Sequence, residues 1–283
     1  MSDSFFNIIF IIFLLTAIIP VFQRKMLAAR RLRMINQLEK SRGTRVITMI
    51  HRQEALSFLG IPLMRFIDIE ESERILRAIR LTEPEVPIDI ILHTPGGLVL
   101  AADQIAAALA RRKGKVTAFV PHYAMSGGTM IALAASEIVM DPDAMLGPVD
   151  PQIGDTFRGM YPATSIITAA KTPNANRDDH TLILADIAVK ALKQQRSKII
   201  ELLVGRMGEQ KAGDMADALG SGRWTHDYPI SATEALGLGL PISVEMPREI
   251  YSLMDLYPQA PQRRPSVEYI PLPYPRPEKP GKG

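Results

Sequence analysis

Strands and helices alternate along the middle of the chain, and this alternation constrains the fold more than any other feature. Runs of β-branched and apolar residues, which are typical of buried strands, are separated by segments with apolar residues at helical spacing. The expected strands cover residues 45–51, 86–93, 115–120 and 136–140, and the expected helices cover residues 68–79, 98–112 and 128–135. Asp68 can cap the first of these helices. The alternation predicts an α/β fold, with a parallel sheet, right-handed crossovers and flanking helices.

Beyond Asp150 the pattern is less regular. We expect a long helix over residues 179–205, then a loop, a short helix over residues 233–236 and a final strand. The composition changes after residue 246, because eight prolines lie between positions 258 and 280. A segment of this composition is expected to be extended or disordered. The predicted organisation is therefore one compact domain over residues 44–245 and a proline-rich tail over residues 246–283.

An apolar run lies near the N-terminus. Residues 5–22 include only two polar side chains, Asn7 and Thr16, and a helix of this length rises about 27 Å, close to the thickness of a bilayer core. The preceding residues hold no Lys or Arg and no small-residue cleavage pattern follows, which favours an anchor over a cleaved signal peptide. We expect one transmembrane helix in residues 1–24 and a basic juxtamembrane helix in residues 25–43 that can contact anionic lipid headgroups. Because the basic residues follow the run, the rest of the chain is expected on the cytoplasmic side.

Composition excludes several classes of function. The chain has no cysteine, so disulfides, thiol catalysis and cysteine-ligated metals are excluded. Its five histidines form no paired zinc motif, and we expect no metal and no cofactor. The net charge of +3 is small, and its basic excess is local rather than spread over a face, so we expect no nucleic-acid partner.

Two glycine-rich turns carry the functional signal. The first is HTPGG over residues 93–97, and the second is YAMSGGTM over residues 123–130; each lies between an expected strand and an expected helix. A serine at such a turn is exposed, and the amide of Gly127 beside it can stabilise an oxyanion at the positive end of the helix dipole. Taken singly, the first turn also fits an ordinary βα turn, and Ser126 also fits a helix N-cap.

Together the two turns are a much more specific signal than either turn alone. Their spacing resembles that in the Clp protease proteolytic subunit and in signal peptide peptidase A. More closely, residues 5–245 resemble the serine dehydrogenase proteinase family, through the anchor and the segments HTPGG, YAMSGGTMIALAASEIVMDP, LGPVDPQIG and GRWTHDYPI..EALGLGLP. The resemblance implies a Clp/crotonase-like fold and a serine endopeptidase that acts on polypeptides. It implies Ser126 as the nucleophile and the amides of Gly97 and Gly127 as the oxyanion hole. Folds of this class bury helical faces between subunits, so we also expect a homo-oligomer.

The general base is harder to identify. In Clp-type peptidases a histidine follows the serine by about two dozen residues, but the matching segment here, residues 145–150, contains none, and Asp150 is not expected to replace it as a strong base. Signal peptide peptidases instead use a lysine from a later helix, which becomes a base when desolvation lowers its pKa. Lys190 is the preferred candidate, because it shares a helical stripe with Ile183 and Ile187. The candidates that remain open are Lys171, Lys193, Lys198 and His122.

Three functions compete at this point. The favoured one is a membrane-anchored Ser-Lys endopeptidase acting on membrane-associated or unfolded polypeptides. The second is a crotonase-like acyl-CoA enzyme, against which the serine on the second turn argues. The third is a non-catalytic membrane scaffold of the same fold that has lost its base.

Overall fold

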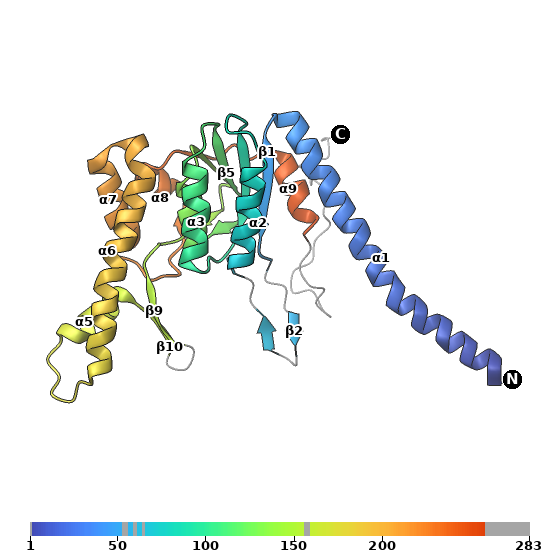
Figure 1. The fold of residues 1–283 in the computed structure, drawn as a ribbon, viewed down its shortest axis with the longest axis horizontal. Coiled ribbons are helices and arrows are strands. Elements are labelled where there is room, and N and C mark those ends of the chain that lie inside the picture. The colour runs from blue at the N-terminus through green and yellow to red at the C-terminus, as the bar shows by residue number, and fades with distance from the viewer. Residues whose placement is uncertain (1, 53–55, 59–60, 64–65, 156–158, 258–283) are drawn as a thin grey trace, which may run out of the picture.

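A five-stranded parallel sheet forms the centre of the molecule (Figure 1). The structure is a computed structural model that describes residues 2–52, 56–58, 61–63, 66–155 and 159–257, with the side chains of residues 2–17, 20, 56–58, 61–63 and 155 outside that description. The strand order is β1 (Arg45–Ile50), β4 (Ile88–His93), β5 (Val116–Val120), β7 (Glu137–Met140) and β12 (Ile242–Ser243), and all neighbours are parallel. The predicted α/β fold with a parallel sheet is confirmed.

Alternate residues of the strands point into two separate hydrophobic layers. Ile90 and Leu92 face the larger layer, whereas Ile91 between them faces the smaller one. The same alternation occurs in β1, β5 and β7, as expected for strands covered on both faces. The sheet therefore lies between two helical layers.

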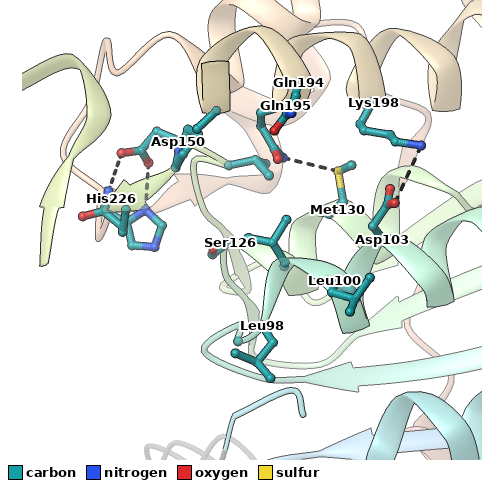
Figure 2. Close-up of a pocket in the computed structure, with 18 of the residues that line it drawn as sticks. Leu98, Leu100, Asp103, Ser126, Met130, Asp150, Gln194, Gln195, Lys198 and His226 are labelled. Carbon is teal, nitrogen blue, oxygen red and sulfur yellow. Dashed lines mark hydrogen bonds and ion pairs between the residues drawn. The ribbon is translucent and has the colours of Figure 1, made fainter. Parts of the chain in front are cut away.

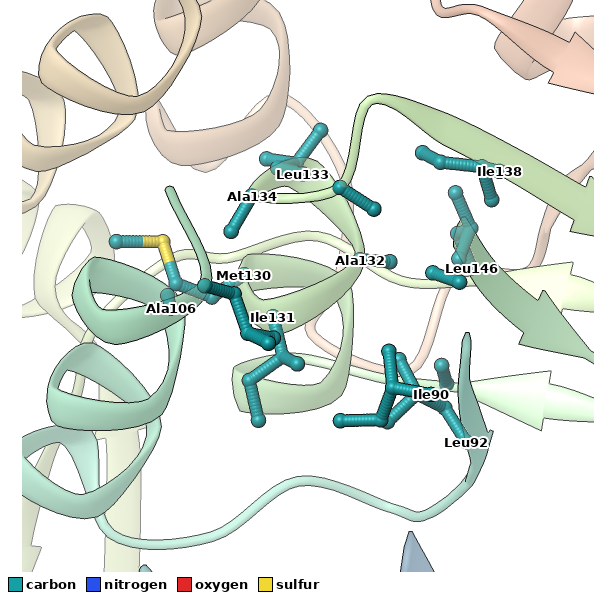
Figure 3. Packing of buried hydrophobic residues seen from close by; sticks show 14 of the residues in the cluster. Ile90, Leu92, Ala106, Met130, Ile131, Ala132, Leu133, Ala134, Ile138 and Leu146 are labelled. Atoms are coloured by element: carbon teal, nitrogen blue, oxygen red, sulfur yellow. The ribbon is translucent and has the colours of Figure 1, made fainter. Parts of the chain in front are cut away.

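The larger layer covers the face of the sheet that also carries the two glycine-rich turns. It contains α2 (Ile69–Arg80), α3 (Val99–Ala110), α4 (Gly127–Leu133), α6 (Asp179–Met207), α7 (Glu209–Gly220) and α8 (Ala232–Gly237). Every residue of α4 is buried, so this helix passes through the core (Figure 3). The absence of charged residues between positions 124 and 135 follows from that burial.

The smaller layer contains residues from near both ends of the described chain. Leu38, near the end of α1 (Ser2–Arg42), packs with Ile250 and Leu253 of α9 (Arg248–Asp255) against the sheet. The extended conformation expected from residue 246 is therefore wrong for the first part of that segment. The buried residues of α9 recur at helical spacing and cover the open face of the sheet, which outweighs the change in composition. Residues 258–283 lie outside the described residues.

The N-terminal helix is continuous and extends away from the sheet (Figure 1). Most of the expected anchor falls on residues whose side chains lie outside the description. Ile18, Ile19, Val21 and Phe22, which are described, are all exposed. Within the described part of the chain, no helix has the length and hydropathy that a membrane crossing requires.

Several short strands and one further helix complete the fold. A three-stranded sheet contains β6 (Tyr123–Ala124), β8 (Met145–Leu146) and β11 (Ile230–Ser231). Two hairpins are formed by β2 (Leu56–Phe58) with β3 (Ile61–Leu63), and by β9 (Gln152–Asp155) with β10 (Gly159–Pro162). The irregular stretch expected after Asp150 thus contains a hairpin, and α5 (Ala163–Lys171) follows it. Sequence reasoning did not anticipate α5, α7 or α9.

Candidate active site

The two glycine-rich turns meet at one pocket. Its volume is about 790 Å³, and Ser126, Gly97 and Gly127 all line it. Figure 2 shows Ser126 between the side chains of α3 and those of α6. The structure therefore brings together the three residues that the sequence assigned to the nucleophile and the oxyanion hole.

Ser126 has an unusual backbone conformation. Its φ is 49° and its ψ is −114°, and in the described part of the chain it is the only residue other than glycine with a positive φ. Such a conformation costs about 1–3 kcal/mol and persists only where the surrounding structure enforces it. The serine of a nucleophile elbow occupies a strained strand-to-helix turn of this kind, which presents the hydroxyl to the substrate. Ser126 lies between β6 and the first residue of α4, as this role requires.

Close packing enforces that turn. A Cβ atom added to Gly96 would lie 2.9 Å from Ser126 Cβ, and one added to Gly128 would lie 2.6 Å from Thr94 Cγ2. The buried Thr129 hydroxyl accepts a hydrogen bond from the Gly147 amide at 3.0 Å and lies 2.7 Å from the Ala124 carbonyl oxygen. The start of α4 is thereby joined to the neighbouring segments. Gly128 is required by space, and Gly96 both by space and by its φ of 106°.

The amides of Gly97 and Gly127 are available for an oxyanion. Ile67 passes close beside Gly97, where it accepts from the Leu98 amide and donates to the Gly96 carbonyl, each at 2.8 Å. Neither of these bonds uses the Gly97 amide. Gly127 begins α4, so its amide has no acceptor within the helix. A Cβ atom on Gly127 would lie 3.6 Å from Gly97 N, which shows how closely the two turns approach.

A histidine and an aspartate line the same pocket. His226 Nδ1 lies 2.8 Å from Asp150 Oδ1, and the side chain of Gln152 donates to Asp150 Oδ2 at 2.6 Å. The Asp150 side chain is 1% exposed, whereas that of His226 is 34% exposed. No described residue bonds the other ring nitrogen of His226, Nε2. A buried carboxylate that holds Nδ1 leaves Nε2 to face a reacting group.

Sequence reasoning missed this pair. The segment expected to carry the histidine, residues 145–150, contains none, and Asp150 was not expected to replace a histidine as a strong base. His226 stood in the GRWTHDYPI segment that carried the family resemblance, but its distance from Asp150 in sequence gave no geometric signal. The loop is held by Trp224, whose ring stacks on that of Tyr228 with centroids 5.1 Å apart.

The preferred lysine does not lie at the pocket. Lys190 Nζ is 2.5 Å from Asp186 Oδ2, and the lysine side chain is 67% exposed. Ile183 and Ile187, which were expected to provide an apolar setting, are 57% and 44% exposed. The described residues around Lys190 therefore do not provide the apolar setting that a neutral lysine requires.

The pocket face of α6 is a different stripe. Ala191, Gln194, Gln195 and Lys198 line the pocket at spacings of three and four residues. Glu201 accepts from Lys198 Nζ at 3.2 Å and Asp103 lies 3.7 Å from the same atom, and both carboxylates raise the pKa of this lysine. Lys198 therefore carries a proton at neutral pH and cannot accept one from serine.

The other candidate bases also lie elsewhere. Lys171 and Lys193 are exposed and do not line the pocket. His122 is exposed, and its ring stacks on that of His93 with centroids 5.4 Å apart. Burial, and then the positive charge of Arg52, lower the pKa of His93 to about 4. Among the described residues no group of three His, Asp or Glu side chains is arranged to hold a metal ion.

Acyl transfer through a serine hydroxyl is the chemistry that these groups can perform together. The molecule is a serine peptidase. Residues 1–282 match the family described as ClpP-like SDH-type serine proteinase, and the chain belongs to that family.

The chain is also similar to two relatives and to several solved structures. Two uncharacterized proteins of Methanocaldococcus jannaschii, MJ1495 and MJ0137, are each 52% identical to the chain, over 98% and 90% of its length and 92% and 87% of theirs. The 1510-N membrane-bound stomatin-specific protease is 22% identical, with a TM-score of 0.45 over 66% of this chain and 79% of that one. ClpP1 from Listeria monocytogenes is 17% identical, with a TM-score of 0.44 over 74% of this chain and 97% of that one.

Proposed function

We propose that the chain cleaves polypeptides with a triad of Ser126, His226 and Asp150. The observation that carries the proposal is the hydrogen-bonded His226–Asp150 pair on the pocket that Ser126 also lines. The pair supplies the base that sequence reasoning did not find. It therefore also argues against a scaffold without catalysis, which was suggested by the missing base.

In this mechanism His226 Nε2 accepts the proton of Ser126 Oγ as Oγ attacks the scissile carbonyl. The amides of Gly97 and Gly127 stabilise the oxyanion of the tetrahedral intermediate. His226 then donates its proton to the leaving amine, which leaves an acyl-enzyme that water hydrolyses by the same proton transfers. Asp150 orients the ring and stabilises the imidazolium that forms.

The pocket wall indicates the substrate chemistry. Most of its lining on the α3 side is apolar, and Met130, Val149 and Met160 add to it. Such a wall favours an extended or unfolded polypeptide with an apolar side chain beside the scissile bond. A folded substrate would keep such side chains buried.

We further propose that the enzyme is held at a membrane by residues 5–22, with the catalytic domain on the cytoplasmic side. The support is the apolar sequence and the basic residues that follow it. We also propose that the enzyme forms a homo-oligomer. Exposed apolar side chains on α6, at Leu182, Ile183, Ile187 and Val189, support a contact with a second subunit.

Proteolysis by the purified full-length protein tests the triad. Ser126→Ala should abolish cleavage of an unfolded protein such as labelled casein, and His226→Ala should lower kcat by about 10³-fold or more. His180→Ala is the matched control, since His180 is an exposed residue at the start of α6 outside the pocket. Normal turnover by Ser126→Ala would refute the proposed function, whereas normal turnover by His226→Ala alone would refute only the identity of the base.

A further inference from the structure

A second row of hydrogen-bonded side chains lies behind the first glycine-rich turn. His51 Nδ1 lies 2.8 Å from Thr94 Oγ1, and His51 Nε2 lies 2.8 Å and 2.9 Å from the two carboxylate oxygens of Glu71. His51 follows β1, Thr94 follows β4, and Glu71 belongs to the first turn of α2. None of the three lines the pocket, so they do not contact a substrate there.

Thr94 connects this row to both turns of the site. Its hydroxyl oxygen accepts from the Gly96 amide at 3.1 Å. Its backbone amide donates to the Tyr123 carbonyl at 3.1 Å, and its carbonyl accepts from the Met125 amide at 3.0 Å. Thr94 therefore determines how the turn carrying Gly97 lies against the turn carrying Ser126.

The burial of Thr94 excludes a direct catalytic role for this row of side chains. A hydroxyl, an imidazole and a carboxylate in this order resemble a second catalytic triad, but Thr94 is 0% exposed and cannot reach a substrate. Both nitrogens of His51 are bonded within the protein, so its ring is fixed in position. Whichever of Thr94 Oγ1 and His51 Nδ1 is the donor, the Thr94 oxygen is bonded to both His51 and Gly96.

We propose that Thr94, His51 and Glu71 are positioning residues that hold the Gly97 amide toward the oxyanion. The role rests on the proposed peptidase function, because it acts only through the oxyanion hole. Loss of one oxyanion donor costs about 10²–10³ in kcat, and a displacement of about 1 Å can cost about 10². A variant in which this row no longer holds the turn should therefore have a lower kcat and an almost unchanged ground-state affinity for substrate.

The main test compares three threonine variants of the full-length enzyme on an internally quenched Leu- and Ala-rich peptide. Thr94→Val should lower kcat about 10- to 100-fold with KM within about twofold, and Thr94→Ser should restore most of the loss. Thr82→Val is the matched control, since Thr82 is also buried and donates one hydroxyl bond, to the Ala78 carbonyl at 2.8 Å, outside the pocket. Its kcat should match that of the unaltered enzyme.

A peptide aldehyde and the corresponding alcohol separate positioning from general loosening of the fold. The aldehyde forms a tetrahedral adduct in the oxyanion hole, so Thr94→Val should weaken it by about the same factor as kcat. The alcohol should bind as before. Equal weakening of both compounds, or an unchanged kcat in folded Thr94→Val, would overturn the proposal.

Glu71→Ala provides a second, milder test, because Glu71 is half-exposed and its replacement leaves no large cavity. It should lower kcat several-fold with little change in KM, and Glu71→Gln should lower it less. If Thr94→Val does not fold, an unchanged kcat in Glu71→Ala overturns the role. If the unaltered enzyme and Ser126→Ala cleave the peptide equally, the proposed function has failed and this role fails with it.

Discussion

His93 should make the stability of this enzyme depend on pH. The histidine ends β4 inside the core, with a side chain that is 2% exposed, and its Nδ1 atom has no hydrogen-bond partner among the described residues. Burial and the positive charge of Arg52 lower its pKa from 6.5 to about 4. The neutral ring is thus the form that the folded protein accommodates, whereas the unfolded chain protonates it near pH 6.5.

The direction and the size of this pH dependence follow from the linkage between protonation and folding. Because the folded pKa is the lower one, the unfolded state binds more protons between pH 6.5 and pH 4. The contribution to stability is complete above pH 6.5 and is lost as the pH falls toward 4. Each unit of difference between the folded and unfolded pKa corresponds to about 1.36 kcal/mol of stability. The full loss of stability therefore approaches about 3 kcal/mol, of which about 2 kcal/mol is lost between pH 7.5 and pH 5.

Urea unfolding followed by the fluorescence of Trp224, the only tryptophan, measures this loss. His93→Phe is the matched variant, because it keeps a ring against His122 and Tyr123 but cannot titrate. Groups remote from His93 titrate equally in both proteins, so their contributions cancel in the difference between the two free energies of unfolding. The two proteins should diverge by about 2 kcal/mol on going from pH 7.5 to pH 5. Curves that stay parallel over that range would refute the reasoning.

Three further predictions concern the site and can be checked with the same peptide assay. Asp150→Asn should lower kcat by about 10³–10⁴ with KM nearly unchanged, because the ring of His226 loses its charged partner; a KM effect alone would contradict this. Lys190→Ala should keep nearly full activity, whereas a Ser-Lys enzyme would lose it. Gly96→Ala should inactivate the enzyme, since at a φ of +106° the new methyl group would meet Ser126 Cβ at 2.9 Å; labelling of Ser126 by a fluorophosphonate would test whether the serine is still reactive.

Much of the fold was accessible from sequence because local patterns determine it. The parallel strands are β-branched runs that end at turns, and α2 begins where Asp68 caps it by accepting from the Glu71 amide at 2.9 Å. The errors fall where packing outweighs composition. In α9, three buried side chains at helical spacing cover the sheet beside a proline-rich segment.

The proposed nucleophile, Ser126, and the proposed oxyanion donors, Gly97 and Gly127, were also accessible, because they belong to two continuous turns on which the family resemblance placed these roles. The proposed base was not. Asp150 and His226 are separated by 76 residues and meet only in the folded chain. For Lys190 the periodicity of α6 grouped this lysine with Ile183 and Ile187, but it did not show that their stripe is exposed and differs from the one that lines the pocket.

The two histidine–carboxylate pairs of this chain show what separates a base from a structural residue. His51 is 2% exposed and both of its ring nitrogens are bonded, one to Thr94 and one to Glu71. A ring in that position can hold neighbours in place but has no nitrogen left to accept a serine proton. Among the described residues His226 is bonded at Nδ1 alone, to a buried Asp150, and it is partly exposed at the pocket. A histidine–carboxylate pair can thus serve two purposes, and the ring nitrogen left without a described partner, rather than the proximity of a carboxylate, is the ground on which we propose His226 as the base.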